Sequence, residues 1–225
     1  MRRGSAGLGS IFAAGALALG TGACVGRDAP DRASESPEVA KAPAEGVSGR
    51  APAAMGGIPS VIVMRPIGDG ATTAASGPAA QREEPHIDQF GLSFSPTLLV
   101  VDVGTPLTFT NSEGALTHNV HLRSVDRNES VFNEDTNSGD AIRATLTESG
   151  GYDVLCDMHP GMAAFVFVTD APYTVFAEAE GSFTLGRVPP GAYEIRTWTR
   201  AAGYGPADTV SVAGTFTEVD LSGLR

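Results

Sequence analysis

Short runs of β-branched, aromatic and leucine residues follow one another from His86 to the end of the chain. They recur roughly every ten residues and are separated by clusters of Gly, Asn, Ser and Asp, which is the spacing of strands and turns in β-sandwiches. No window of about 12 residues carries the apolar periodicity of an amphipathic helix. We therefore predict an all-β chain that folds into two sandwiches.

The expected strands fall into two groups, one before and one after residue 170. The first group is expected at 98–103, 106–110, 117–122, 142–146, 152–156 and 163–168. The second group is expected at 173–177, 182–185, 192–199, 209–212 and 216–221, with an upstream strand at 60–64. Residues 86–170 should therefore form one domain, and the later strands belong to a second.

The N-terminus has the pattern of an export signal. Arg2 and Arg3 precede the apolar run IFAAGALALG, and small residues lead to Cys24. The run is too short to span a bilayer, so we expect a signal peptide at 1–23 and a disordered tether at 24–45. Small residues before Cys24 resemble a bacterial lipoprotein processing site. We expect a periplasmic protein, or one anchored outside the inner membrane or on the outer membrane through a lipid on Cys24; export without lipidation stays open.

Charge and histidine content single out one part of the chain. The net charge is -11, which argues against nucleic acid as a partner because phosphate binding requires a basic face. Residues 86–170 hold twelve acidic residues against three arginines, and they hold all four histidines. We therefore expect the function to lie in this segment. Its acidity is typical of a solvated face and would also favour a basic redox partner.

The cysteine count argues for a bound metal. The chain has two cysteines, and Cys24 stands at the expected processing point. Cys156 is then left without an internal disulfide partner in an oxidising compartment. A metal ion would occupy this thiol.

Strand alternation indicates which side chains face inward. Tyr152 and Val154 share a face with Cys156, so the thiol should enter the core at the end of its strand. In the strand THNVHL, the same rule turns His118 inward and turns Asn119 and His121 outward. We therefore interpret His118 as a candidate ligand and His121 as a solvated residue.

The stretch CDMHPGM supplies three further donors. Cys156, His159 and Met162 follow one another closely, and Pro160-Gly161 suits the sharp turn between the last two. With the imidazole of His118, these residues offer two nitrogens, one thiolate and one weak thioether, which suits a single copper ion that alternates between Cu(I) and Cu(II). Zinc makes little use of a thioether. Met158 is the weaker candidate for the axial position.

These motifs resemble the cupredoxin family of small blue copper proteins. The resemblance rests on the strand Y-x-V-x-C, the loop C-x-x-H-x-x-M and the segment FTNSEGALTHNV, and it covers residues 86–169. The loop length is most similar to that of amicyanin. The resemblance implies a Greek-key β-sandwich with copper bound by His118, Cys156, His159 and Met162. It also implies that Asn119 supports the site through a backbone N–H directed at the cysteine sulfur.

The flanking segments resemble a second family. GVSGRAPAAMGGIPSVIVMRP and EGSFTLGRVPPGAYEIRTWT are similar to the first and last strands of carboxypeptidase regulatory-like (transthyretin-like) β-sandwiches. The resemblance implies a small discontinuous sandwich at 46–65 and 171–225, with the cupredoxin inserted into it, as in methylamine utilisation-type proteins. Trp198 should lie in the core or rim of this second sandwich.

The cupredoxin resemblance implies a one-electron carrier between redox partner proteins. We expect the partner to dock over Pro160, Gly161, Ala163 and Ala164, where the edge of His159 should approach solvent. We do not expect an enzyme, because an oxidase or nitrite reductase needs additional histidines, typically H-x-H pairs, for a second copper centre. Copper delivery or storage, and a surface binding module with a structural copper, are the alternatives.

Overall fold

A computed structural model describes residues 45–68 and 84–223, and the regular structure in these ranges consists entirely of β-strands. Seventeen strands there form four sheets. The prediction of an all-β fold is confirmed for these residues. No helix within these ranges is long and apolar enough to cross a membrane. The predicted signal peptide and Cys24 lie outside the described residues, as does the predicted tether except for Glu45.

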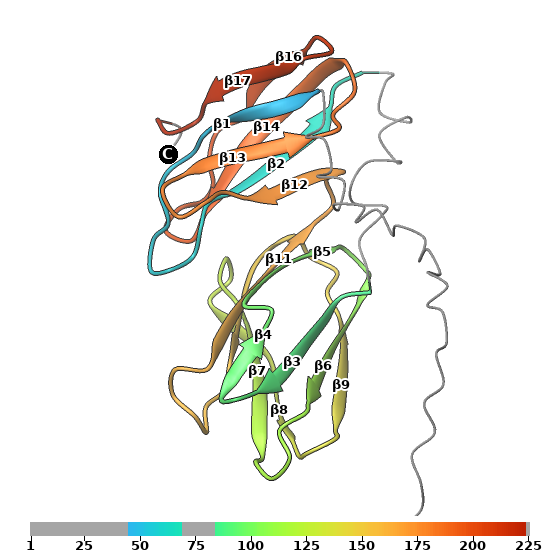
Figure 1. Ribbon diagram of the computed structural model, residues 1–225, viewed down its shortest axis with the longest axis vertical. Helices are drawn as coiled ribbons and strands as arrows, with labels where there is room; N and C mark the ends of the chain where they lie inside the picture. Colours follow the sequence, from blue (N-terminus) through green and yellow to red (C-terminus); the bar gives the residue numbers. More distant parts are fainter. Residues whose placement is uncertain (1–44, 69–83, 224–225) are drawn as a thin grey trace, which may run out of the picture. The chain divides into compact units, whose positions relative to one another are not determined.

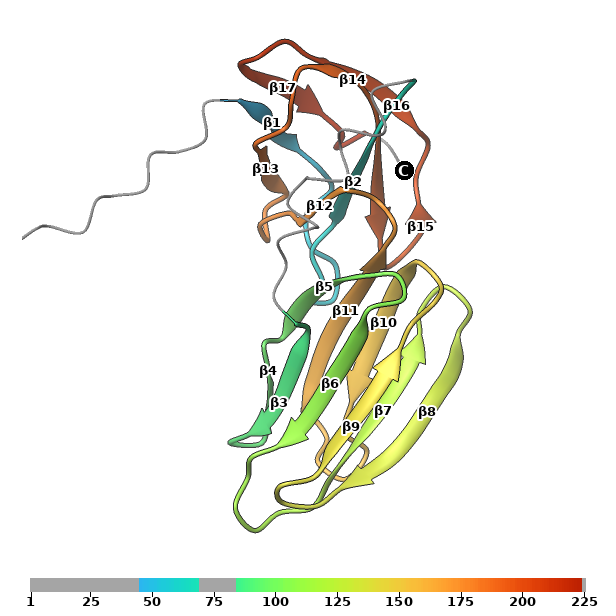
Figure 2. The same cartoon turned by 90° about the vertical axis from the view of Figure 1, so that its right-hand side faces the viewer.

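Strands β3 to β11 build one sandwich, which we call the metal-loop sandwich. Its first sheet has the order β4-β3-β6-β9 and contains β3 (His86–Phe90), β4 (Ser93–Ser95), β6 (Pro106–Asn111) and β9 (Ala141–Thr145). Its second sheet has the order β5-β11-β10-β7-β8 and contains β5 (Leu98–Asp102), β7 (His118–Ser124), β8 (Glu129–Thr136), β10 (Gly150–Leu155) and β11 (Ala163–Thr169). Figure 2 shows these strands lying roughly along a common axis, with antiparallel neighbours such as β6 and β9.

Alternation along β10 and β11 builds the core of this sandwich. Tyr152 and Val154 of β10 are buried in one cluster with Val166 and Val168 of β11. Cys156, just beyond the end of β10, belongs to the same cluster. The cysteine therefore enters the core where the alternating pattern of its strand predicts.

Strand β8 was not expected from the sequence, nor were β3, β4 and β15. Strand β8, with the sequence ESVFNEDT, is exposed along most of its length. It pairs with β7 at the edge of the sheet. A polar edge strand lacks the apolar alternation that marks a half-buried strand. Pairing with β7, rather than a hydrophobic face, accounts for its extended conformation.

The remaining strands build the flanking sandwich. One sheet has the order β13-β1-β17, with β1 (Gly46–Arg50), β13 (Ser182–Gly186) and β17 (Phe216–Asp220). The other has the order β12-β2-β14-β15, with β16 beside β14; its strands are β2 (Val61–Pro66), β12 (Tyr173–Phe176), β14 (Gly191–Thr199), β15 (Gly203–Tyr204) and β16 (Asp208–Val212). Figure 1 shows β1 beside β13 and β17, although these segments are far apart in the sequence.

Trp198 was expected in the core or at the rim of the flanking sandwich, and it lies outside the core. That core contains Tyr193 and Ile195 of β14, whereas Trp198 projects from the opposite face of the strand. The indole is fully buried against Phe165 and Phe167 of β11, with ring centroids 5.4 Å from each. A Cβ at Gly151 would come within 2.5 Å of the indole, so this close approach requires glycine.

Candidate metal centre

Three adjacent strands bring the candidate ligands to one end of a sheet. Strand β10 pairs with β7 on one side and with β11 on the other. Cys156 directly follows β10, and His118 is the first residue of β7. Residues 156–162, which we call the metal loop, connect β10 to β11 and carry His159 and Met162. Long-range strand pairing therefore unites residues that lie about forty positions apart in the sequence.

The donor atoms of His118, Cys156 and His159 converge. All three lie within 4.8 Å of one another. The Nδ1 atoms of the two histidines are 2.9 Å apart, and the Cys156 Sγ lies 3.9 Å from Nδ1 of His118 and 3.7 Å from Nδ1 of His159. Two nitrogens and one sulfur thus face a common point.

The burial of these residues suits a metal that must be shielded from water. The side chain of His118 is fully buried, Cys156 is 4% exposed, and His159 is half-buried. A buried thiol beside two converging imidazole nitrogens is a set of soft and borderline donors, and this type of set suits copper. Cys156 forms no disulfide and therefore remains available as a ligand.

Met162 is the thioether enclosed with the other donors. Its side chain is 3% exposed and lies in the same buried cluster as Cys156, whereas Met158 is 43% exposed. The loop closes on itself, because the Cys156 N–H donates to the Met162 carbonyl (3.2 Å) and the Met162 N–H donates to the His159 carbonyl (3.1 Å). Gly161, at a φ of 104°, makes the turn between His159 and Met162. This arrangement favours Met162 over Met158 as the thioether that would hold a metal at this site.

Glu113 orients His118, a role that we did not predict. Its Oε2 atom lies 3.2 Å from Nε2 of His118 and accepts a hydrogen bond from the Leu92 N–H at 3.1 Å. The pKa of the Glu113 carboxyl is lowered, first by the bond from Leu92 and further by the His118 ring. An acceptor at Nε2 favours the tautomer in which Nδ1 carries the lone pair directed towards Cys156. The one acidic residue of FTNSEGALTHNV could have indicated this role in the sequence.

Asn119 supports the metal loop through its side chain. Its Oδ1 atom accepts hydrogen bonds from the backbone N–H groups of Asp157 (2.8 Å) and Met158 (3.3 Å), and its Nδ2 donates to Asn133 (2.6 Å). The side chain points away from the core, as expected, but it is 3% exposed because the loop covers it. The expected backbone contact to the cysteine sulfur remains a prediction.

His121 and His86 lie outside the donor cluster. The two ring nitrogens of His121 face Asp157 (3.0 Å) and the hydroxyl of Ser130 (3.1 Å). The pKa of Asp157 is lowered, chiefly by its hydrogen bond with His121. His86 is exposed and pairs with Thr110 at 2.8 Å. Both histidines therefore have polar partners of their own.

The expected docking residues divide into an exposed group and a buried one. Pro160, Gly161 and Ala163 are exposed, but Ala164 is 6% exposed and faces the core. Neighbouring residues of β11 point to opposite faces of the sheet, so Ala164 cannot share the surface of Ala163. The docking patch must therefore exclude Ala164.

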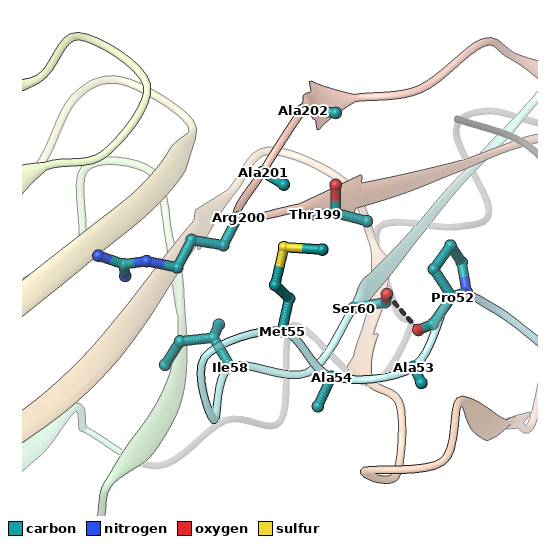
Figure 3. A pocket seen from close by; sticks show the side chains of 10 residues that line it. All are labelled: Pro52, Ala53, Ala54, Met55, Ile58, Ser60, Thr199, Arg200, Ala201 and Ala202. Atoms are coloured by element: carbon teal, nitrogen blue, oxygen red, sulfur yellow. Dashed lines mark hydrogen bonds between the residues drawn. The ribbon is translucent and has the colours of Figure 1, made fainter.

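A separate hollow of about 520 Å³ lies on the flanking sandwich. It is bordered by the segment between β1 and β2 and by the end of β14, and Figure 3 shows Met55 among small side chains. Ser60 in its wall donates a hydrogen bond to the Pro52 carbonyl at 2.6 Å. Arg200 points away from the other lining residues in Figure 3 and pairs with Asp153 instead. This lining offers no group of donors comparable to the metal centre.

The metal-loop sandwich is similar in sequence to a family of copper-binding proteins. Residues 83–169 match the family model of copper binding proteins, plastocyanin/azurin family. No curated protein matches the chain.

Three solved structures illustrate the similarity. A purple cupredoxin from Nitrosopumilus maritimus is 27% identical, with 38% of this chain and 99% of that chain covered and a TM-score of 0.33. A point mutant of amicyanin in its Cu(I) form is 30% identical, with 40% and 89% covered and a TM-score of 0.35. A copper-containing nitrite reductase from Thermus scotoductus SA-01 is 22% identical, with 45% and 29% covered and a TM-score of 0.36.

Proposed function

We propose that the protein is an exported type 1 (blue) copper protein that carries single electrons between redox partner proteins and is not an enzyme. The match of residues 83–169 to the family model of copper binding proteins, plastocyanin/azurin family, supports this proposal. The observation that carries this proposal is the convergence of the His118, Cys156 and His159 donor atoms within 4.8 Å. Met162, buried in the same cluster as Cys156, completes the proposed ligand set.

The chain's own residues suit electron transfer in three ways. Bound copper would supply a one-electron Cu(I)/Cu(II) couple, for which two imidazoles, a thiolate and a thioether are a suitable ligand set. His118 and Cys156 are buried, which excludes water from the site. Glu113 and Asn119 hold the His118 ring and the start of the metal loop, so the ligands keep their positions when the charge of the site changes.

Electrons would enter and leave at the half-buried His159. The surrounding surface includes the exposed Pro160 and Gly161 and the exposed side chain of Met158. A small apolar surface of this kind suits transient contact with a partner. The acidic charge of residues 86–170 would favour a partner with a basic rim and would speed its approach at low salt.

The proposal extends to the rest of the chain. We propose that residues 1–23 direct export to the periplasm and that Cys24 carries a lipid anchor. We also propose that 46–65 and 171–225 are the two parts of a transthyretin-like sandwich. The pairing of β1 with β13 and β17, and of β2 with β12 and β14, supports this discontinuous arrangement.

The proposal is tested by titrating the purified mature protein with Cu(II) and recording its visible spectrum. We expect one copper per chain and an intense thiolate-to-copper band that bleaches on reduction and returns on oxidation. A spectrum without this band, at a stoichiometry of one, would contradict type 1 coordination and would favour a different use of the bound copper.

The docking surface is tested with a matched pair of exposed methionines. Met158 is 43% exposed on the metal loop, and Met55 is 58% exposed on the flanking sandwich. We expect Met158→Asp to slow electron exchange with a partner protein, or between two copies of the protein, by about tenfold or more. Met55→Asp should leave the rate unchanged. Equal rates for the two variants would place the docking surface elsewhere.

A further inference from the structure

The flanking sandwich covers the outer face of the two strands that bracket the metal loop. Phe165 and Phe167 of β11 point away from the core of the metal-loop sandwich, yet both are fully buried. They lie in a separate apolar cluster with Trp198 of β14 and with Val61 and Val63 of β2. The outer face of β11 therefore depends on the flanking sandwich for its burial.

Polar contacts secure β10 at the same junction. Arg200, just beyond β14, binds both carboxylate oxygens of Asp153 on β10, with an Nη2–Oδ2 distance of 2.6 Å. The hydrogen bond with Asp153 raises the pKa of Arg200. Asp126 accepts hydrogen bonds from the Trp198 indole (3.0 Å) and from the Gly151 N–H (2.9 Å), which joins the start of β10 to β14.

The Arg200–Asp153 contact lies near the candidate ligand Cys156 in the sequence. Asp153 lies on β10, three residues before Cys156. Leu155, the last residue of β10, pairs with Ala163 at the base of the metal loop. A bidentate arginine–carboxylate pair fixes both the position and the orientation of its partner. The Asp153 side chain is 17% exposed and that of Arg200 is 36% exposed, so the pair is partly shielded from water.

We infer that the flanking sandwich braces the metal loop, with Arg200 as a positioning residue that acts through Asp153 and β10. The inference rests on the proposed function only in assigning residues 156–162 as the metal loop. Asp157, Met158, Pro160 and Gly161 of this loop are exposed, so its geometry depends on the strands at its base together with the hydrogen bonds to Asn119. A brace on β10 therefore limits the opening of the loop.

Hydrogen exchange in the full-length, metal-free protein tests this inference without copper. The reporting amides are those of Cys156 and Met162, whose hydrogen bonds close the loop. We expect Arg200→Met to speed their exchange about tenfold relative to core amides of the same sandwich, because a charged hydrogen-bonded pair is lost.

Arg65→Met is the matched control. Arg65 of β2 pairs with Asp170, beyond the opposite end of β11 from the metal loop. Loss of this more exposed pair should change exchange at Cys156 and Met162 by less than about twofold. Arg200→Lys keeps the charge without the planar fork and should give an intermediate rate.

Asp153→Asn provides a second way to break the pair if Arg200→Met unfolds the protein. The same amides should exchange faster, again by about tenfold. Equal acceleration by Arg200→Met and Arg65→Met, or acceleration of all amides alike, would overturn the inference. Failure of the protein to bind copper would contradict the proposed function but would leave this exchange result intact.

Discussion

The two sandwiches have similar frames but different contents. The metal-loop sandwich combines five- and four-stranded sheets, and the flanking sandwich combines five- and three-stranded sheets. Residues 86–170 carry twelve acidic residues against three arginines, whereas 46–66 and 171–225 together carry six of each. All four histidines and Cys156 belong to the first region, and the second has neither residue type.

This difference separates chemistry from support. In the metal-loop sandwich, the donor residues gather at one end of three adjacent strands, and hydrogen bonds to Glu113 and Asn119 hold them. The flanking sandwich instead contributes an aromatic side chain, Trp198, which packs on Phe165 and Phe167 of the other sandwich. Substitutions of the donor residues should therefore alter copper chemistry with little effect on folding, and loss of Trp198 should chiefly lower stability.

The largest effect on chemistry is expected from Cys156→Ser. Loss of the thiolate should abolish the intense visible band and weaken copper binding by at least about a hundredfold, more than the loss of an outer hydrogen bond. Cys24→Ser, which removes the other cysteine, should leave the spectrum unchanged. Copper titrations of the two variants provide the measurement, and a surviving band in Cys156→Ser would refute the ligand assignment.

The largest effect on folding is expected from Trp198→Ala. The indole is fully buried between the sandwiches, so its removal should lower the free energy of unfolding by about 3–5 kcal/mol. Phe216→Ala, at a site that is 39% exposed, should cost much less, about 1 kcal/mol or below. Denaturant unfolding measures both. Equal stability of the two variants would contradict the claim that burial of Trp198 between the sandwiches stabilises the protein.

A smaller effect on copper chemistry is expected from Glu113→Gln. Glutamine can still accept a hydrogen bond from His118, but it removes the negative charge that favours the more positive oxidised site. We expect weaker Cu(II) binding by about tenfold and a higher reduction potential, with the melting temperature nearly unchanged. Glu134→Gln, an exposed charge on β8, is the control. An unchanged potential would mean that Glu113 only completes the local packing.

The smallest effect is expected from Asp88→Asn. Burial raises the pKa of this carboxyl, but hydrogen bonds from Thr110 and Ser112 outweigh burial and lower it below 3.8. The stabilisation is therefore present above the unfolded value and is lost as pH falls through the folded pKa. The variant should lose less than about 1 kcal/mol at pH 7, because the site is largely solvated, and should approach the parent stability below pH 3.8. A pH-independent difference between parent and variant would contradict this linkage.

The sequence was most informative where side chains alternate or where donors are clustered. Alternation predicted that His118 and Cys156 point inward, and CDMHPGM placed His159 and Met162 beside them. It could not reveal β8, whose polar residues carry no periodic signal. The contact of Trp198 with β11 could not be predicted, because the opposite face of β14 is buried by another sandwich and a single strand does not encode that contact.

The most direct test of the central claim is whether the copper stays bound while electrons pass. The copper-loaded protein should be cycled repeatedly between oxidised and reduced states in the presence of a Cu(I) chelator. An electron carrier should keep its one copper, and its visible band should return fully after each cycle. Transfer of copper to the chelator on the first reduction would contradict the claim and would identify the metal as cargo.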